Sequence, residues 1–227
     1  MIPKLIWQTH EAPADDLKAF EKNAANTWNF LNATWTHKYV DGEQRALDIQ
    51  DYDPELTEIY LRLSKTTQSD LWRYVKLYQE GGVYADMDSV CVKPLDDFMD
   101  EFYAGQEMVC TGIGENVGEN QVNCANFAAV KNSKILKDIL DSIKSQYQVL
   151  MVEDTIDELF QNQSLPWNTF CETVMANQDD VLFGFNCESH SSELKIEFSD
   201  YDVYYNGQTY RYLNLAKLQD WDVYIGL

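Results

Sequence analysis

The stretch "SDLWRYVKLYQEGGVYADMDSV", residues 69–90, decides the fold. Apolar side chains recur at i, i+3, i+4 and i+7 within residues 65–80, which predicts an amphipathic helix. Its buried stripe consists of Leu71, Tyr74, Val75 and Tyr78. Gly81 and Gly82 follow in the usual position for a helix end. The apolar run that comes next predicts a buried strand over residues 83–88, which ends in two aspartates.

Strands and helices alternate along the rest of the chain, which predicts an α/β layered sheet in a single domain over residues 1–227. The tail "YDVYYNGQTYRYL" (201–213) has Asn206-Gly207 between alternating aromatic runs, which is a hairpin signal and argues against a purely parallel sheet. Further strands are expected at 3–7, 34–40, 107–113, 124–130 and 181–185. Further helices are expected at 15–28, 43–50, 54–63, 133–146, 153–161 and 167–177.

Composition sets the broad class of the protein. A hydrophobic content of 45% is enough to bury a sizeable core, and a net charge of −21 argues against nucleic acid or an anionic membrane as a partner. No apolar stretch reaches the roughly 18 residues of a membrane span, and the N-terminus does not read as a signal peptide. The cysteines lack CxxC spacing, which indicates reduced thiols and predicts a cytoplasmic protein. They are Cys91, Cys110, Cys124, Cys171 and Cys187.

Asp86 and Asp88 are the candidate metal ligands. If both lie in a strand, they share a face while Met87 turns into the core. Two carboxylates this close raise each other's pKa unless a positive charge lies between them, and all-oxygen ligation favours Mg²⁺, Mn²⁺ or Ca²⁺. Two ligands leave room for water and for phosphate oxygens, although many such acid pairs are simply solvated. An EF-hand is excluded, because Val90 and Cys91 occupy its fifth and sixth positions.

Asp70 and Arg73 are three residues apart in the preceding helix and therefore share one face. One interpretation is a helix-surface ion pair, which contributes a few tenths of a kcal/mol. The other is that Arg73 contacts a sugar or diphosphate while Asp70 accepts hydrogen bonds from sugar hydroxyls. The spacing leaves both interpretations open.

Taken together, these residues resemble the core of the DXD-containing sugar transferase family. That family includes yeast Golgi α-mannosyltransferases, bacterial and viral polysaccharide transferases and, more distantly, the large clostridial glucosylating toxins. The opening "IPKLIWQTH" also resembles the first strand of the family, and "CANFAAVKNSKILKDIL" is a weaker match. The residues that match the pattern are Ser69, Asp70, Arg73, Gly81, Gly82, Tyr84, Asp86 and Asp88.

The resemblance implies a GT-A fold, an α/β/α sandwich with a mixed, mostly parallel sheet. It implies transfer of a hexose from a nucleotide sugar, with UDP-sugar favoured over GDP-sugar, to a glycan or other hydroxyl acceptor with retention of configuration, as in polysaccharide biosynthesis. The cofactor would be Mn²⁺ or Mg²⁺, bound directly by Asp88 and directly or through water by Asp86. Asp70 and Arg73 would hold the donor sugar, and Tyr84 would lie beside it.

Two further positions follow from the same resemblance. Trp7 matches a position at which the toxin branch stacks an aromatic ring on uracil, and the alternative is a buried structural tryptophan. Asn126 matches an asparagine that faces the donor, with Asn123 as its competitor.

The chain departs from the family pattern near its C-terminus, where no His-His-Trp-like segment is found. His190 could supply a third metal ligand, and Asp220 could do so or, like Trp221, close over the donor. No catalytic nucleophile follows from the sequence.

Two other classes of function remain open. A metal-dependent phosphohydrolase would use D-x-D as nucleophile and acid, but such enzymes usually carry that motif after their first strand. A sugar-nucleotide or glycan binding module without turnover is the other alternative, because a shared fold does not settle activity.

Overall fold

The computed structural model describes residues 1–89, 91, 94–112, 122–152, 164–183, 195–197, 202–205 and 208–211. Within them, six strands form one sheet in the order β2-β1-β3-β5-β4-β6. The strands are β1 (Leu5–Thr9), β2 (Thr36–Val40), β3 (Gly82–Ala85), β4 (Met108–Gly112), β5 (Val122–Ala129) and β6 (Val181–Phe183).

The sheet is mixed and mostly parallel, as expected. β1 pairs in parallel with both β2 and β3, and β4 pairs in parallel with β6. β5 runs antiparallel to both of its neighbours, β3 and β4. The carboxyl ends of β1 and β3 therefore lie side by side at one edge of the sheet, which is where open α/β sheets place their ligands.

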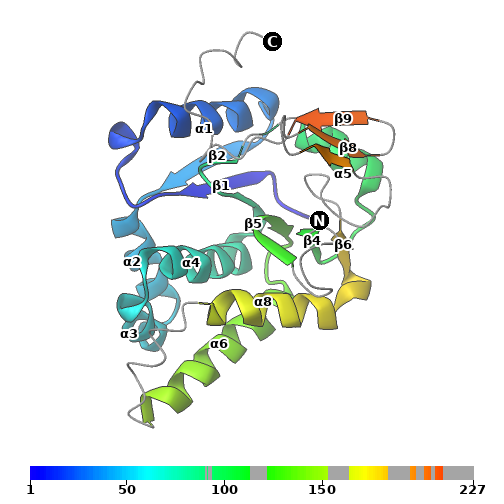
Figure 1. Cartoon of the computed structure of the whole chain (residues 1–227). Helices are drawn as coiled ribbons and strands as arrows, with labels where there is room; N and C mark the ends of the chain where they lie inside the picture. The colour runs from blue at the N-terminus through cyan, green and yellow to red at the C-terminus, as the bar shows by residue number, and fades with distance from the viewer. Residues whose placement is uncertain are drawn as a thin grey trace.

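Helices cover both faces of this sheet (Figure 1). α1 and α5 pack on one face, and α4, with α2, α3, α6 and α8 around it, packs on the other. Their bounds are α1 (Ala19–Leu31), α2 (Gly42–Tyr52), α3 (Pro54–Arg62), α4 (Lys65–Glu80), α5 (Leu95–Phe102), α6 (Lys134–Val152) and α8 (Leu165–Ala176). Two 3₁₀ turns, Ala14–Asp16 and Gln178–Asp180, complete these layers.

The strands alternate between two hydrophobic cores. Along β3, Val83 and Ala85 belong to the core that contains Trp28 of α1, whereas Tyr84 belongs to the larger core under α4. Because successive strand residues point to opposite faces, this alternation accounts for the α/β/α layers. Within the described residues, none of the helices combines the length and the apolar character that crossing a membrane requires.

α4 is the central helix and matches its expected bounds. Leu71, Tyr74 and Val75 of the expected stripe are fully buried, and Tyr78 packs against the core in part. The helix ends at Gly81, whose N–H donates to the Leu77 carbonyl at 2.8 Å.

Gly81 and Gly82 both have positive φ, 68° and 108°. A Cβ on Gly82 would lie 2.6 Å from the Leu5 carbonyl oxygen, and a Cβ on Gly81 would lie 2.8 Å from Pro3. Glycine is needed at both positions, because their φ is positive and because Pro3 and Leu5 pass directly against this turn.

Two expectations are corrected. The helix expected at 15–28 begins only at Ala19, because Lys18 is extended and its N–H donates to the Glu21 carboxylate at 2.8 Å, which caps the helix there. The strand expected over 83–88 ends at Ala85, and the following residues form a turn in which the Ser89 N–H donates to the Asp86 carbonyl at 3.0 Å.

The expected tail hairpin is confirmed as an antiparallel pair of β8 (Asp202–Tyr205) and β9 (Gln208–Arg211), joined by β7 (Lys195–Glu197) in a separate sheet. The helix expected at 153–161 lies outside the described residues. The described cysteines, Cys91, Cys110, Cys124 and Cys171, are buried and form no disulfide bond with one another.

Candidate active site

A cleft of about 400 Å³ lies where β1 and β3 end, beside the first half of α4. His10 directly follows β1 and Asp86 directly follows β3. Segments that are far apart in the sequence thus meet in this cleft. The lining residues are Thr9, His10, Glu11, Glu21, Arg45, Lys65, Thr66, Ser69, Arg73, Asp86, Met87 and Asp88.

The turn that carries Asp86 and Asp88 is held on two sides. The Asp86 N–H donates to the Ala125 carbonyl of β5 at 2.8 Å, and the Trp28 indole N–H of α1 donates to the Ser89 carbonyl at 2.8 Å. Met87 is 6% exposed and thus turns into the protein, as expected. The two aspartates reach the cleft from a turn, so the strand-face argument for their side-by-side placement is wrong.

Gln8 and His37 hold the same turn from a third side. The buried Gln8 amide donates to the Asp86 carbonyl at 3.1 Å and, at 2.7 Å, its oxygen faces Nε2 of His37. Asn29 Nδ2 donates to Nδ1 of the same ring at 3.1 Å, so Nε2 carries the hydrogen. Burial lowers the pKa of His37 to about 4, which keeps the ring neutral in this arrangement.

Arg73 is a buried hub between two carboxylates. Its Nη2 lies 2.9 Å from Asp70 Oδ1 and 3.2 Å from Asp86 Oδ1, and its Nη1 donates to the Cys124 carbonyl at 2.7 Å. The guanidinium lies over the Tyr84 ring at 4.2 Å. Burial acts to lower the pKa of Arg73, but these neighbours outweigh it and raise that pKa well above the ordinary value.

This geometry excludes one of the two interpretations of Asp70 and Arg73. Their ion pair is buried, with side-chain exposures of 14% and 5%, so it is not a helix-surface pair. Burial raises the pKa of Asp70 although Arg73 opposes the shift. The chain's own acceptors engage the guanidinium, so Arg73 orients Asp86, and its expected contact with the donor stays a prediction.

Asp86 and Asp88 differ in their electrostatics. Asp86 Oδ1 accepts from the Tyr84 hydroxyl at 2.6 Å and pairs with Arg73. The pKa of Asp88 is raised, first by burial and then by the charge of Asp86. Asp70, Asp86 and Asp88 are three carboxylates around a single cation, Arg73, so the pair lies in a region of excess negative charge.

The two carboxylates fit a hard divalent cation, because their donor atoms are all oxygen and an added positive charge would relieve the raised pKa of Asp88. Among the residues that the structure describes, no group of three or more histidine, cysteine, aspartate or glutamate side chains is placed to hold a metal. The described part thus offers the aspartate pair, with other positions left to water and substrate oxygens.

Trp7 lies in the core. It is 2% exposed, its indole N–H donates to the Gly81 carbonyl at 3.0 Å, and its ring meets Trp72 edge-on at 6.5 Å. This is the structural tryptophan that the sequence left open as the alternative to base stacking. Asn126 is buried on β5 opposite Ala85, one residue from the Asp86 turn.

Several expected residues lie outside the described part of the chain. His190, Asp220 and Trp221 belong to this group, and the side chain of Asn123 on β5 does too. Their expected contributions stay predictions.

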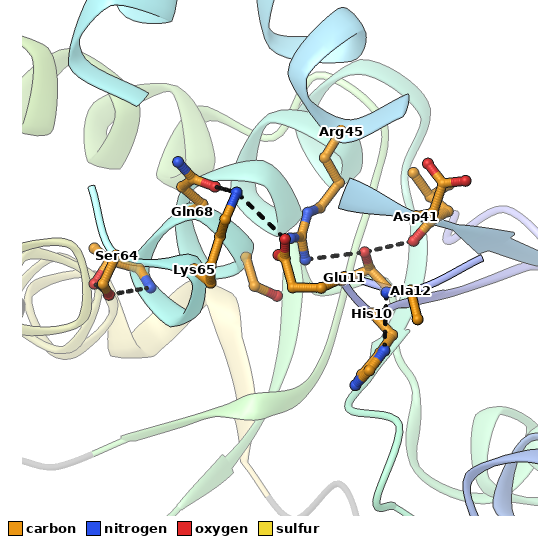
Figure 2. A network of polar contacts seen from close by, with 12 residues as sticks. His10, Glu11, Ala12, Asp41, Arg45, Ser64, Lys65 and Gln68 are labelled. Carbon is orange, nitrogen blue, oxygen red and sulfur yellow. Dashed lines mark hydrogen bonds and ion pairs between the residues drawn. The ribbon is translucent and has the colours of Figure 1, made fainter. Parts of the chain in front are cut away.

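Sequence reasoning missed the other wall of the cleft. Arg45 of α2 and Lys65 of α4 both approach the carboxylate of Glu11 (Figure 2). His10 Nε2 lies 3.6 Å from Glu21. The sequence did contain a signal for Arg45, because this residue lies one turn before Ile49 in α2 and therefore on the same, buried side of the helix.

Residues 14–104 match the family model described as "Glycosyltransferase sugar-binding region containing DXD motif". The chain is 35% identical over 104 residues to an initiation-specific alpha-1,6-mannosyltransferase of Candida albicans, a match that covers 43% of this chain and 27% of that protein. It is 30% identical over 109 residues to the protein of the same name in Saccharomyces cerevisiae, covering 43% of this chain and 22% of the relative. The chain thus matches only about a quarter of the length of these relatives.

The fold has its own match. The UDP-bound glycosyltransferase domain of the YGT toxin superimposes with a TM-score of 0.56 at 9% identity, over 80% of this chain and 79% of that domain. The α/β sandwich is thus the fold of GT-A glycosyltransferase domains. Over residues 14–104, the stretch that holds both cleft aspartates, the chain is similar to the glycosyltransferase family whose sugar-binding region contains a DXD motif.

Proposed function

We propose that the chain is a metal-dependent glycosyltransferase that moves a sugar from a nucleotide-sugar donor to a hydroxyl group of a glycan or other acceptor. The observation that carries this proposal is the carboxylate pair at the end of β3. Asp86 and Asp88 line a substrate-sized cleft, and together with Asp70 they have a single buried cation, Arg73, between them, so part of their negative charge is left unneutralised. Such a site suits a divalent cation together with an anionic substrate.

The chain's own residues set the geometry of the site. Tyr84 and Arg73 fix one oxygen of Asp86, and Gln8 fixes its backbone, so the carboxylate is oriented before any ligand arrives. Asp88 is the directly binding carboxylate, and Asp70 keeps Arg73 in place. When bound, Mn²⁺ or Mg²⁺ supplies charge neutralisation for the departing diphosphate.

The donor is proposed to be a UDP-sugar, and the support is the similar fold of a toxin domain whose structure holds UDP. The names of the yeast relatives support a hexose as the transferred group. Retention of configuration, a role in polysaccharide synthesis, a single domain over the whole chain and a cytoplasmic location are proposed with it, on the sequence argument.

The test is a screen of nucleotide sugars by thermal shift with and without Mn²⁺, followed by transfer and hydrolysis assays with the stabilising donor. The Asp88→Asn variant should lose at least about 100-fold in turnover, the scale of a lost transition-state charge contact. Asp141→Asn, an exposed surface carboxylate paired with Lys137, is the control and should keep full turnover. Unchanged turnover in Asp88→Asn would refute the assignment, and donor binding without any turnover would favour a binding module.

A further inference from the structure

Glu11 lines the cleft and lies between two cations, Arg45 and Lys65. Arg45 Nη2 contacts Oε1 of Glu11, and Lys65 Nζ lies 3.4 Å from its Oε2 (Figure 2). The three side chains come from the loop after β1, from α2 and from the first turn of α4. Arg45 is 2% exposed, whereas Glu11 is 37% and Lys65 69% exposed, so the carboxylate is the replaceable partner of a fixed buried cation.

Arg45 is incompletely satisfied by this arrangement. Its Nη1 donates to the Thr9 hydroxyl at 3.2 Å, but its buried Nε makes no hydrogen bond to the described residues, although the Tyr60 hydroxyl lies near the guanidinium. A buried guanidinium with an unused donor is costly, and a planar oxyanion with several acceptor atoms is the group that best satisfies it. Arg45 also lines the cleft, so a ligand bound in the cleft would lie close to its side chain.

The sum of the charges that line the cleft also favours an anion at Arg45. Four carboxylates (Glu11, Glu21, Asp86, Asp88) and three permanent cations (Arg45, Lys65, Arg73) leave one net negative charge. A divalent cation converts this to one net positive charge. The diphosphate of a sugar nucleotide carries one ionised oxygen on each phosphate, so the cleft falls one positive charge short unless a carboxylate leaves. Arg73 is already counted in this sum, and Asp70, which does not line the cleft, also engages it.

We propose that Arg45 and Lys65 bind an oxyanion of the donor's diphosphate, and that Glu11 is the resident counter-ion which this anion displaces. The inference rests on the proposed function, since it deepens the description of the same cleft. It assigns donor binding to two cations outside the DXD pattern. Glu11 then lowers donor affinity by competing for them, and it keeps Arg45 neutralised while the cleft is empty.

The test depends on the direction in which the affinity for UDP changes, because competition requires that removing the charge of Glu11 strengthens binding. We expect Glu11→Gln to tighten binding of UDP in the presence of Mn²⁺ about threefold, measured by calorimetry at low salt, because one competing ion pair is removed. If Glu11 only anchors its loop, the same variant leaves the affinity unchanged or weakens it, and that result overturns the proposal.

Glu80→Gln is the matched control. Glu80 is also 37% exposed and is also shared between a buried cation, Lys76 at 3.3 Å, and an exposed one, Lys38 at 3.7 Å, but it does not line the cleft. It removes the same charge from the same acidic protein. We expect UDP affinity to be unchanged in Glu80→Gln, and an equal gain in both variants would show a general charge effect and overturn the proposal.

Lys65→Gln supplies an independent arm, since Lys65 is exposed and its replacement leaves the fold intact. We expect it to weaken binding of UDP about threefold and to leave binding of uridine unchanged, because uridine lacks the phosphates. If Glu11→Gln does not fold, this arm decides, and equal UDP affinity in Lys65→Gln and wild type overturns the proposal.

Inorganic pyrophosphate separates this inference from the proposed function. If wild type binds no nucleotide with Mn²⁺, the glycosyltransferase proposal fails, and pyrophosphate without metal still compares Glu11→Gln with wild type. Tighter pyrophosphate binding in Glu11→Gln supports the oxyanion site on its own, and equal binding contradicts it.

Discussion

Arg73 and Lys76 are two buried cations that lie one turn apart in α4 and have similar surroundings, but only Arg73 lines the cleft. Arg73, with 5% side-chain exposure, lies between Asp70 at 2.9 Å and Asp86 at 3.2 Å. Its guanidinium stands 4.2 Å from the centre of the Tyr84 ring.

Lys76 repeats this pattern one turn further along the helix. With 9% side-chain exposure, it lies between Asp48 at 3.0 Å and Glu80 at 3.3 Å, and its ammonium stands 5.0 Å from the centre of the Trp7 ring. Trp72 also donates to Asp48, at 2.8 Å. In each cluster, two carboxylates and an aromatic face repay the cost of burying the cation.

The difference between the clusters is the third carboxylate. Asp88 stands beside the Arg73 cluster, lines the cleft and has a raised pKa, whereas the Lys76 cluster does not line the cleft. A buried ion pair therefore does not mark the site. The site is marked by negative charge in excess of what the neighbouring cation neutralises.

The largest expected effect comes from removing each cation while keeping its bulk. Arg73→Met and Lys76→Met should each lower the free energy of unfolding in urea by about 3–5 kcal/mol, because each leaves buried carboxylates without a partner. Added Mn²⁺ should restore part of the loss in Arg73→Met, since a cation in the cleft reaches Asp86, and none of it in Lys76→Met. Equal recovery in both variants would erase the distinction between the clusters.

A smaller effect is expected from the amide that holds the aspartate turn. Gln8→Leu removes the donor to the Asp86 carbonyl and should cost about 1–3 kcal/mol of stability. Gln68→Leu is the control, because Gln68 is equally buried and donates to the Tyr60 carbonyl at 2.9 Å, away from the turn. We expect similar losses of stability by urea unfolding but a weaker Mn²⁺ affinity only in Gln8→Leu. Similar Mn²⁺ affinities would show that Gln8 has no part in positioning Asp86.

The smallest effect is a pH dependence of opposite sign at two aspartates. The pKa of Asp88 is raised above 3.8 by burial and by Asp86, so its stability contribution is fully present below 3.8 and is lost as pH rises through the raised pKa. Burial also acts to raise the pKa of Asp53, but the hydrogen bond and charge of Lys144 and the backbone hydrogen bonds of Glu55 and Leu56 together outweigh it and lower that pKa. The contribution of Asp53 is therefore present above 3.8 and is lost as pH falls through the lowered pKa.

Urea unfolding across the acid range measures both slopes. Asp88→Asn should be more stable than wild type at neutral pH, and this advantage should shrink as the pH falls. Asp53→Asn should be less stable than wild type at neutral pH, and its deficit should shrink as the pH falls. Two slopes of the same sign would contradict the electrostatic difference between these sites.

The sequence predicted what depends on local pattern and on the motif. The spacing of the apolar residues predicted both ends of α4 correctly. The Gly81-Gly82 pair marked its C-terminal end, because only glycine fits against Pro3 and Leu5 there. Asp70, Arg73, Tyr84 and Asp86 do meet at one point.

The sequence could not predict contacts that the fold makes between distant segments. Glu11 and Arg45 are 34 positions apart, and Gln8 and Asp86 are 78 apart, so no local period reports either pair. It also gave no sign that the strand ends at Ala85. The hydrogen bonds of Asp86 and Ser89 that form the turn join backbone atoms, which every residue type has.

Mn²⁺ binding, measured from the electron paramagnetic resonance signal of the free ion, tests the central claim most directly. Wild type is titrated beside Asp88→Asn and Asp48→Asn, which remove one carboxylate from each side of the comparison. We predict that wild type and Asp48→Asn bind Mn²⁺ in the presence of UDP and that Asp88→Asn does not, although Asp48→Asn is the less stable variant. Equal Mn²⁺ binding by Asp88→Asn and wild type would contradict the claim.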